Sequence, residues 1–461
     1  MGNLANYNLS DTIAAVATFP SASALGVIKV SGRKAIPILS RVFRPKSRKS
    51  MSKVKTYTLH YGWITTGDKT VDEALVSVMR RPRSYTREDV VEISSHGGVV
   101  VLNKILGLLV KNGARLAKPG EFSYRAFING RIDLSQVQAI ADIVDAKDER
   151  ALFSLSQQLK GEFSKRIGKI VDKLKEIISV LEAAINFPDE ETGVDFKKIR
   201  GDLNLLSKNA EAVLNNQNEA RILRQGLRCV ICGKSNVGKS TIFNRLLKEE
   251  RVIVTHRPGT TRDAIEETII INGVPLKICD TAGIVEAKDF IDKQAMRRSY
   301  DKLAEADIVL FIFDYSRRYD KKDACLMDKL KGKNTIFIVN KIDLKQKLDL
   351  VKLKQLKRPL VKLSALKTSG LDALEKVILK SVYVKGVDKK DDIFLLARWQ
   401  VDLLKSVRAS VIEALGFIKK GYSADYVSFS LKPALDDLSK LSGETASEEI
   451  LSRIFSSFCI G

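Results

Sequence analysis

The sequence predicts a multidomain protein of α/β and all-α structure: an N-terminal α+β domain, a helical domain, and a doubly wound α/β domain inserted into the helical one. Three observations support this class. Short β-rich and helical runs alternate before residue 130. Helical apolar stripes lie on both sides of the middle of the chain. Four Gly-, Asp- and Asn-containing motifs follow one another between residues 233 and 343. A chain of 461 residues has room for about three domains.

Residues 1–130 show the alternation expected of a small α+β domain. The β-rich runs are Thr12–Thr18, Gly26–Val30, Thr56–Trp63, Glu73–Met79 and Asp89–Ser94, and the helical runs are Ala35–Val42 and Val100–Lys111. We therefore expect a sheet with helices packed against it.

Residues 131–218 are expected to form the first part of the helical domain. Asp133–Ile143 is predicted to be helical. Ala151–Ile185 carries apolar residues at three- and four-residue steps, which is the pattern of one long helix with a single apolar stripe.

Residues 385–461 supply the second part of the helical domain. From Leu395 to Leu415 apolar residues recur every four residues, and a last helix is expected to begin near Thr445. Neither part has enough partners to bury its stripe alone, so the two parts are expected to pack together. Coiled-coil dimerisation is the alternative for the longer stripe.

Residues 219–384 contain nucleotide-site motifs. Gly233–Ser240 has the sequence G-K-S-N-V-G-K-S, the pattern of a phosphate-binding loop. Its glycines let backbone N–H groups surround the phosphates, Lys239 reaches the β- and γ-phosphates, and the Ser240 hydroxyl can bind Mg²⁺. Pro258–Asp263 (P-G-T-T-R-D) and Asp280–Gly283 (D-T-A-G) follow in the order of a Ras-like P-loop domain.

The fourth motif, N-K-I-D at Asn340–Asp343, indicates which nucleotide is bound. A carboxylate at Asp343 can accept hydrogen bonds from N1–H and the exocyclic amine of guanine. Adenine lacks both donors, so ATP would leave this carboxylate unpaired at a cost of about 1–3 kcal/mol or more. The four motifs together predict a GTP site.

The runs around these motifs fit a parallel sheet with the ligand at the carboxyl ends of its strands. The expected strands are Leu227–Ile231, Val274–Cys279, Ile308–Phe313, Thr335–Val339 and Leu360–Leu363, and the helix after the first motif is Thr241–Leu247. Ser364 and Ala365 follow the last strand, where a base-contacting loop is expected.

The composition limits the partners and the compartment. Lys and Arg number 78 against 55 Asp and Glu, a net charge of +23, which favours a polyanionic partner such as RNA; a solvated basic surface is the equal alternative. No window of about 18 apolar residues predicts a membrane span. Five cysteines are typical of a reducing, cytoplasmic protein without disulfides. Cys229 and Cys232 would face opposite sides of a strand, so a zinc site is not expected.

Nearly the whole chain resembles the bacterial and organellar tRNA-modification GTPases of the MnmE or TrmE family. The matching segments are D-T-I-A-A-V-A-T (Asp11–Thr18), S-H-G-G (Ser95–Gly98), P-G-E-F-S-Y-R-A-F (Pro119–Phe127), A-A-I-N-F-P-D-E-E (Ala183–Glu191), the four nucleotide motifs and the terminal I-F-S-S-F-C-I-G.

This resemblance implies a K⁺-dependent GTPase. With an FAD-dependent partner of the MnmG or GidA type, the family adds an aminomethyl or carboxymethylaminomethyl group to C5 of the wobble uridine of tRNA. It further implies a 5-formyl- or methylene-tetrahydrofolate bound by the N-terminal domain, a homodimer formed through that domain, and a heterotetramer with the partner.

The resemblance also implies site residues. The GTP site would comprise Asn236, Val237, Gly238, Lys239, Ser240, Thr241, Thr255, Thr260, Thr261, Asp280, Thr281, Ala282, Gly283, Asn340, Lys341, Asp343, Ser364 and Ala365. Ser240 and Thr261 would hold Mg²⁺, and Asn236, Thr255, Arg257 and Thr260 would surround K⁺. Lys29, Glu92 and Arg131 would bind the folate.

Some positions differ from the family pattern. Asp292 stands where the family has its catalytic glutamate, and its side chain is shorter by one C–C bond; the alternative is an exposed helix residue. Lys29 replaces an arginine and Arg131 a lysine, which keeps the charge and changes the geometry. Arg87 stands in place of a glycine and would be strained if that glycine needs a positive φ.

Cys459, the third residue from the end, is expected to act in the modification site, with a buried structural thiol as the alternative. Two other functions stay open at this stage. One is a ribosome-assembly or RNA-binding GTPase switch without RNA-modifying chemistry. The other is a scaffold that hydrolyses GTP slowly, which would follow from Asp292 and from the absence of a lysine after Gly461.

Overall fold

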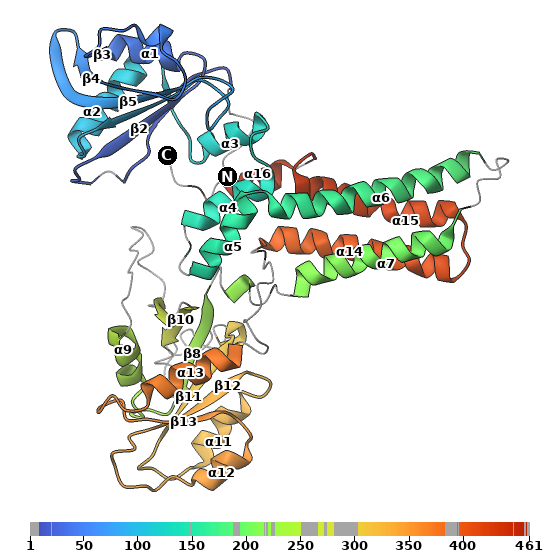
Figure 1. Cartoon of the computed structure of the whole chain (residues 1–461). Helices are drawn as coiled ribbons and strands as arrows, with labels where there is room; N and C mark the ends of the chain where they lie inside the picture. Colours follow the sequence, from blue (N-terminus) through green and yellow to red (C-terminus); the bar gives the residue numbers. More distant parts are fainter. Residues whose placement is uncertain are drawn as a thin grey trace, which may run out of the picture. The chain divides into compact units, whose positions relative to one another are not determined.

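The computed structural model describes residues 9–19, 21–144, 146, 149–187, 194–215, 217, 220–222, 226–249, 266–271, 274–280, 303–382, 394, 396–445, 447–455 and 458 (Figure 1). The chain divides into two compact units. The first comprises Met1–Val144, Leu155–Leu214 and Ala397–Gly461, and the second comprises Asp145–Ser154 and Asn215–Leu396. None of the helices among these residues is long and apolar enough to cross a membrane.

The N-terminal part of the first unit is a seven-stranded sheet in the order β3-β4-β5-β6-β2-β1-β7. All neighbouring strands are antiparallel except β1 and β7. The strands are β1 (Ile13–Val16), β2 (Gly26–Ser31), β3 (Phe43–Pro45), β4 (Thr58–Thr66), β5 (Lys69–Met79), β6 (Val90–Ser95) and β7 (Arg115–Leu116). The five expected strands are present. Strands β3 and β7 were not predicted because they are only three and two residues long, too short to show an alternation of apolar and polar residues.

Helices α1 (Ala35–Val42) and α2 (Val99–Lys111) pack on one face of this sheet. Alternate strand residues such as Ile28 and Ile93 form a single core with Leu39 and Leu109 of the two helices. On the opposite face, α3 (Glu121–Ile128) brings Phe122 against Ile13 of β1. A 3₁₀ turn (Met51–Lys53) precedes β4. The α+β class predicted for this region is confirmed.

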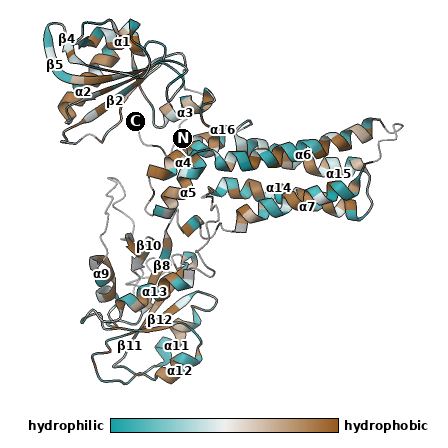
Figure 2. Cartoon of the chain, in the orientation of Figure 1, coloured by the Kyte–Doolittle hydropathy of each residue, from teal (hydrophilic) through white to brown (hydrophobic). Residues whose placement is uncertain are grey.

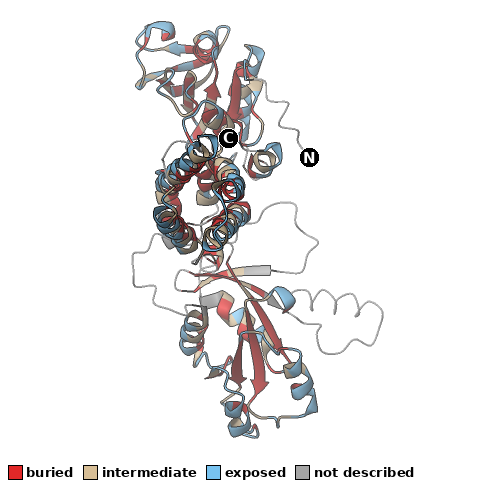
Figure 3. Ribbon diagram, turned by 90° about the vertical axis from the view of Figure 1, so that its right-hand side faces the viewer, coloured by how far each residue is buried: buried red, intermediate tan, exposed pale blue. Residues whose placement is uncertain are grey.

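The rest of the first unit is helical. Its helices are α4 (Leu134–Val144), α5 (Glu149–Leu159, which extends into the second unit), α6 (Glu162–Asn186), α7 (Phe196–Asn215), α14 (Arg398–Lys419), α15 (Ala424–Ser442) and α16 (Glu448–Phe455). Helices α6, α7, α14 and α15 lie side by side in both views (Figures 1 and 3). In Figure 2, hydrophobic and hydrophilic residues alternate along α6 and α15.

The prediction of one long helix over 151–185 is wrong. The segment forms α5 and α6, which are separated at Gly161, whose φ is +86°. This left-handed backbone ends α5 and precedes the first residue of α6. Leu155 before the break and Phe163 after it are both buried, so the apolar pattern continues from one helix to the next. The last helix begins at Glu448 rather than at Thr445, and Ile450 N donates to Ser447 Oγ (3.4 Å) in its first turn.

Helical segments that are far apart in sequence pack together. The apolar residues of α6, including Leu174 and Leu181, are buried within the chain. Polar contacts also join these segments: Arg408 on α14 pairs with Glu211 on α7, and Gln400 Nε2 donates to Ser135 Oγ on α4. Much of the long apolar stripe is therefore covered by the protein's own helices, while Leu152, Leu159 and Ile185 are exposed.

The second unit contains a six-stranded sheet in the order β13-β12-β11-β8-β10-β9, parallel except for the edge strand β9. Its strands are β8 (Leu227–Gly233), β9 (Glu266–Ile271), β10 (Val274–Asp280), β11 (Ile308–Asp314), β12 (Thr335–Asn340) and β13 (Leu360–Lys362), and the helices are α9 (Lys239–Glu249), α11 (Lys321–Asp328), α12 (Leu350–Gln355) and α13 (Leu371–Val382).

Both faces of this sheet are buried. Along β11, Leu310 faces a core shared with Ile242 of α9 and Leu374 of α13, and Phe311 faces a second core shared with Leu353 of α12. Burial on both faces explains why the central strands are continuously apolar rather than alternating. The doubly wound fold predicted from the sequence is confirmed. It brings the carboxyl ends of β8, β10, β11 and β12 to one edge.

Candidate nucleotide-binding site

The loop between β8 and α9 has a backbone that few sequences can adopt. Gly233 and Gly238 have φ of +146° and +99°, and Asn236 has φ of +61°. A Cβ atom on Gly233 would lie 2.6 Å from Ile312 O, and one on Gly238 would lie 2.2 Å from Asn340 Nδ2. Glycine is therefore required at both positions by backbone conformation and by close contact. A loop of this kind at a helix N-terminus forms a concave site for phosphate groups.

Lys239 and Ser240 stand at the first turn of α9, as the motif predicts. Lys239 Nζ donates to Gly233 O (3.1 Å) and to Lys234 O (2.8 Å). The ammonium group is thus held over the loop, where a bound nucleotide would place its phosphates. The Ser240 and Thr241 side chains are exposed and the Val237 side chain is buried.

Asn340, at the end of β12, connects two loops of the site. Its Nδ2 donates to Val237 O (2.9 Å), and its Oδ1 accepts from the backbone N–H of Ala365 (3.0 Å). The side chain is 2 % exposed, so both bonds lie in the protein interior. Asn340 therefore fixes the phosphate loop against the loop that is expected to contact the base.

Lys341 has a left-handed backbone (φ +64°) and makes a second connection. Its Nζ donates to Asn236 O and to Asp314 Oδ2, both at 2.7 Å. Burial opposes ionisation of Asp314, but hydrogen bonds from Lys341 and Ser316 outweigh it and hold the Asp314 pKa below its usual value. Asp314, which is 4 % exposed, was not among the residues predicted from the sequence.

Asp343 is positioned by Ser364. The Ser364 hydroxyl donates to Asp343 Oδ1 (2.5 Å), and this hydrogen bond lowers the pKa of the exposed Asp343 carboxyl. An ionised carboxylate that is fixed on one side and open on the other suits the two N–H donors of guanine. The structure thus brings together the four residues predicted for base recognition, Asn340, Asp343, Ser364 and Ala365.

Beside the phosphate loop lies a cavity of about 490 Å³ that the sequence did not indicate. Lys234, the second residue of the loop motif, lines it and pairs with Asp320 (3.0 Å) and Asp323 (2.7 Å) at the start of α11. These ion pairs raise the Lys234 pKa against the opposing effect of burial. Lys234 therefore ties the loop to the start of α11.

Several predicted residues lie outside the described part of the chain: Thr255, Arg257, Thr260, Thr261, Thr281, Ala282, Gly283, Asp292 and Cys459. The backbone of Asp280 is described; it ends β10 and lies opposite Ile231 of β8, at the edge of the sheet that carries the phosphate loop.

The three residues expected to bind folate lie in the N-terminal part of the first unit. Lys29 and Glu92 face each other across the β2–β6 pair. Arg131 follows α3, and its guanidinium lies 4.7 Å from the centre of the Tyr85 ring. Tyr85 packs with Ala15, which pairs with Lys29 across β1 and β2. All three side chains thus belong to the sheet face that α3 covers in part.

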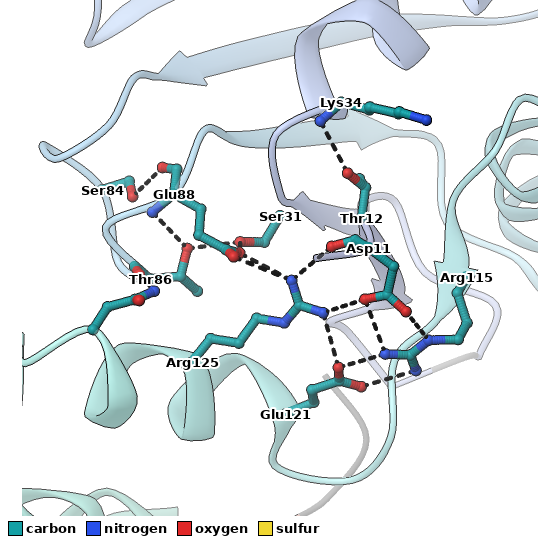
Figure 4. A network of polar contacts seen from close by, with 11 residues as sticks. Asp11, Thr12, Ser31, Lys34, Ser84, Thr86, Glu88, Arg115, Glu121 and Arg125 are labelled. Carbon is teal, nitrogen blue, oxygen red and sulfur yellow. Dashed lines mark hydrogen bonds and ion pairs between the residues drawn. The ribbon is translucent and has the colours of Figure 1, made fainter. Parts of the chain in front are cut away.

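A buried ionic network ties α3 to β1 and β7 (Figure 4). The guanidinium of Arg125, which is 0 % exposed, contacts Asp11 (2.6 Å), Glu121 (3.1 Å) and Glu88 (3.2 Å). Arg115 bridges the same Asp11 and Glu121. Burial opposes the charge on Arg125, and the three carboxylates outweigh it and raise the Arg125 pKa. Glu121 and Arg125, the two charged residues of Pro119–Phe127, are both fully buried, which was not predicted from the sequence.

Arg87 confirms an expectation about strain. Its φ is +58°, in the left-handed region where glycine costs less than any residue with a side chain. Its Nη1 donates to Asn129 O (2.9 Å), two residues before Arg131. A side chain that glycine cannot provide therefore holds the end of α3.

Comparisons with known proteins cover nearly the whole chain. A family model described as the MnmE helical domain matches residues 134–459, and one described as the GTP-binding protein TrmE N-terminus matches residues 12–131. A protein of Thermoanaerobacter pseudethanolicus named tRNA modification GTPase MnmE is 43 % identical over 98 % of this chain and 99 % of its own. Proteins of the same name from Clostridioides difficile and Bacillus pumilus are each 38 % identical over 98 % of the chain and over 99 % and 100 % of their own.

Two solved structures resemble part of the chain. The FeoB G-domain of Methanococcus jannaschii is 30 % identical, with a TM-score of 0.27 over 33 % of this chain and 96 % of its own. Aquifex aeolicus Era is 31 % identical, with a TM-score of 0.29 over 40 % of this chain and 65 % of its own. From the two family models and the full-length relatives, we conclude that the chain belongs to the MnmE/TrmE family of tRNA modification GTPases.

Proposed function

We propose that this protein hydrolyses GTP in the modification of the wobble uridine of tRNA. The observation that carries the proposal is the position of Asn340, which joins the phosphate loop to the base loop beside the fixed carboxylate of Asp343. This arrangement selects guanine and fixes its position relative to the phosphates. Membership of the family supplies the second half of the proposal, because the relatives carry the name tRNA modification GTPase.

Within this site, Lys239 would leave the carbonyl groups it now contacts and neutralise the β- and γ-phosphates. Ser240, exposed at the start of α9, would bind Mg²⁺ together with Thr261. The Asn236 side chain is exposed in the phosphate loop, so its amide oxygen can serve as a K⁺ ligand. Thr255, Arg257 and Thr260 would supply the other ligands. When bound, K⁺ would supply positive charge beside the phosphates. Asp292 is proposed to orient the attacking water, and Thr281, Ala282 and Gly283 to contact the γ-phosphate.

The N-terminal domain is proposed to bind a formyl- or methylene-tetrahydrofolate. The residues present suit a folate, since the ligand carries carboxylates and a pterin ring with both donors and acceptors. Lys29 and Arg131 would pair with carboxylates, and Glu92, opposite Lys29, would accept from the ring. Such a folate supplies a one-carbon unit. Cys459 is proposed to lie in this modification site, and a homodimer with an FAD-dependent partner of the MnmG type is proposed to complete it in the cytoplasm.

The function is tested in cells from which this gene has been deleted. Mass spectrometry of tRNA nucleosides should show loss of the modified wobble uridine, and the wild-type gene should restore it. The Asp343→Asn variant should not restore it, because the new amide donor faces the donors of guanine. Unchanged wobble nucleosides in the deletion strain would refute the modification function and favour an RNA-binding GTPase switch.

The K⁺ proposal has its own test. GTP hydrolysis is measured in K⁺ and in Na⁺ for the wild type and for Asn236→Ala. We expect faster hydrolysis in K⁺, and we expect the substitution to remove this difference while GTP binding stays nearly intact. Equal wild-type rates in the two salts would refute the K⁺ role without affecting the guanine site.

A further inference from the structure

One stretch of the N-terminal domain carries only positive charge. Residues 12–67 contain no Asp or Glu and ten Lys or Arg side chains. At the frequency of the whole chain, 55 acidic residues in 461, a stretch of this length would contain about seven. The ten basic residues are Lys29, Arg33, Lys34, Arg41, Arg44, Lys46, Arg48, Lys49, Lys53 and Lys55. Four of them surround one cavity.

This cavity, the basic cavity, has a volume of about 600 Å³ and is lined by Arg44, Lys46, Arg48 and Lys49 together with Trp63. The register of β3 and β4 places Arg44 opposite Trp63. A tight turn follows β3, in which Arg48 N donates to Pro45 O (3.0 Å) and Arg48 has φ of +55°. The turn adds Lys46, Arg48 and Lys49 to the lining, and all four basic side chains are exposed.

Residues 51–54, which begin at the cavity wall with Met51, are held in place by Arg80. Arg80 Nε donates to Val54 O (2.8 Å), and Arg80 Nη2 donates to Ser52 O (2.6 Å). Met51, which also lines the cavity, is 2 % exposed and belongs to the core under α1. The concave shape is therefore held by the buried Met51 side chain and by hydrogen bonds from the Arg80 guanidinium to backbone carbonyls.

Aromatic rings lie next to these cations. Trp63 and Tyr61 are 36 % and 39 % exposed, and their ring centres are 5.6 Å apart. Lys46 Nζ lies 5.5 Å from the centre of the Tyr61 ring, and the Tyr61 hydroxyl donates to Glu73 (2.9 Å). Within the described part of the chain, no carboxylate forms an ion pair with any of the four cations that line the cavity. Cations without anionic partners beside an open indole suit a ligand with phosphates and bases.

A purely structural role explains part of this arrangement. β3 is the edge strand of the sheet, and charged residues and proline on an edge prevent pairing with other chains. That role accounts for Arg44 and Pro45 on the strand itself. It does not require three further cations in the turn, nor an exposed tryptophan on the neighbouring strand.

We propose that the basic cavity binds a single-stranded segment of tRNA. Phosphates would contact Arg44, Arg48 and Lys49, and an unstacked base would lie on Trp63. Groups of this kind recognise single-stranded RNA because phosphates provide affinity and every base has a face that can stack. The inference rests on the proposed function, since it specifies where the tRNA of that reaction is held.

The test measures binding of the full-length protein to a fluorescent tRNA anticodon stem–loop at several salt concentrations. The cavity variant combines Arg48→Gln with Lys49→Gln. The matched control combines Lys354→Gln with Arg358→Gln, which removes the same two charges from exposed positions in and after α12 of the second unit. We expect the cavity variant to lose affinity about tenfold or more and to lower the salt slope by about 1.4, since each phosphate contact contributes about 0.7 for single strands. The control should change neither by a comparable amount.

Trp63 is tested separately. Trp63→Ala should weaken binding about tenfold, and Trp63→Phe should retain most of the affinity because it keeps an aromatic face. GTP hydrolysis and thermal unfolding of each variant should match the wild type, which separates loss of binding from loss of folding.

Four results would overturn the inference: equal losses in the cavity and control variants, no effect of Trp63→Ala, no RNA binding by the wild type, or binding of a folate polyglutamate in the cavity instead of RNA. None of these results depends on the wobble-nucleoside assay. A protein that binds RNA through the cavity without modifying it would refute the proposed function and leave the binding site standing.

Discussion

Gly238 is the position where one methyl group should uncouple the two halves of the nucleotide site. A Cβ atom there would lie 2.2 Å from Asn340 Nδ2, and the backbone has φ of +99°. Gly238→Ala therefore adds backbone strain of about 1–3 kcal/mol. It also displaces a buried amide that makes two hydrogen bonds, to Val237 O and from Ala365 N, each worth about 0.5–1.5 kcal/mol. In the variant, the native loop geometry should therefore cost about 2–6 kcal/mol more than in the wild type, or about 4 kcal/mol at the middle of these ranges.

In the free protein the loop can relax and avoid most of this cost. GTP requires the native geometry, so the cost returns on binding and the affinity should fall by a factor of about 100 or more. Titration of the full-length protein with a fluorescent GTP analogue measures this loss.

Gly332→Ala is the matched control. Gly332 lies in the same unit with φ of +81°, and no atom lies within 4 Å of its added Cβ. This variant should show strain of about 1 kcal/mol and unchanged GTP affinity. If Gly238→Ala binds GTP within about threefold of Gly332→Ala, the coupling through Asn340 is wrong.

Three further predictions follow from the described contacts. Arg125→Met leaves three carboxylates without their buried partner, so the free energy of unfolding of the N-terminal domain, measured with denaturant, should fall by about 3–5 kcal/mol. A loss below about 1 kcal/mol would show that the network is solvated. The Asp314 carboxyl has a lower pKa in the folded protein than in the unfolded chain, where it is near 3.8, so its ionised form stabilises the fold above that pH. This stabilisation is lost as the pH falls through the still lower folded pKa. The stability measured by unfolding below about pH 4 should therefore depend on pH less steeply in Asp314→Asn than in the wild type. Arg87→Gly loses one hydrogen bond and releases left-handed strain, so it should be more stable than Arg87→Ala by about 1 kcal/mol; the reverse order in thermal unfolding would contradict the strain.

The nucleotide site could be predicted from the sequence because its chemistry is local. A backbone that curves around phosphates needs Gly233 and Gly238 at a fixed spacing, and that spacing is visible without a fold. Asp314 and Lys234 were missed for the opposite reason. Asp314 follows an apolar strand like any strand end, and its partner Lys341 is brought to it only by the parallel register of β11 and β12.

The apolar periodicity of residues 151–185 predicted which side chains are buried better than it predicted where each helix ends. Leu155 and Phe163 are both buried, so the apolar steps suggest one helix although the backbone turns at Gly161 between them. The pattern reports which side chains face the core, and two helices that meet at a left-handed residue can present the same side chains. A positive φ at a glycine is decided by the packing on both sides, which the sequence does not display.

The net charge, like the apolar periodicity, does not show where in the fold its residues lie. The net charge of +23 is compatible with RNA binding and with a solvated basic surface, because a sum over the chain says nothing about position. The structure shows where part of this charge lies, since the β3–β4 register places Arg44 beside Trp63 and the following turn adds Arg48 and Lys49. A solvated surface needs no aromatic ring among its cations. The interpretation as an RNA site therefore rests on the tryptophan as much as on the charge, and Trp63→Ala is the variant that decides between the two.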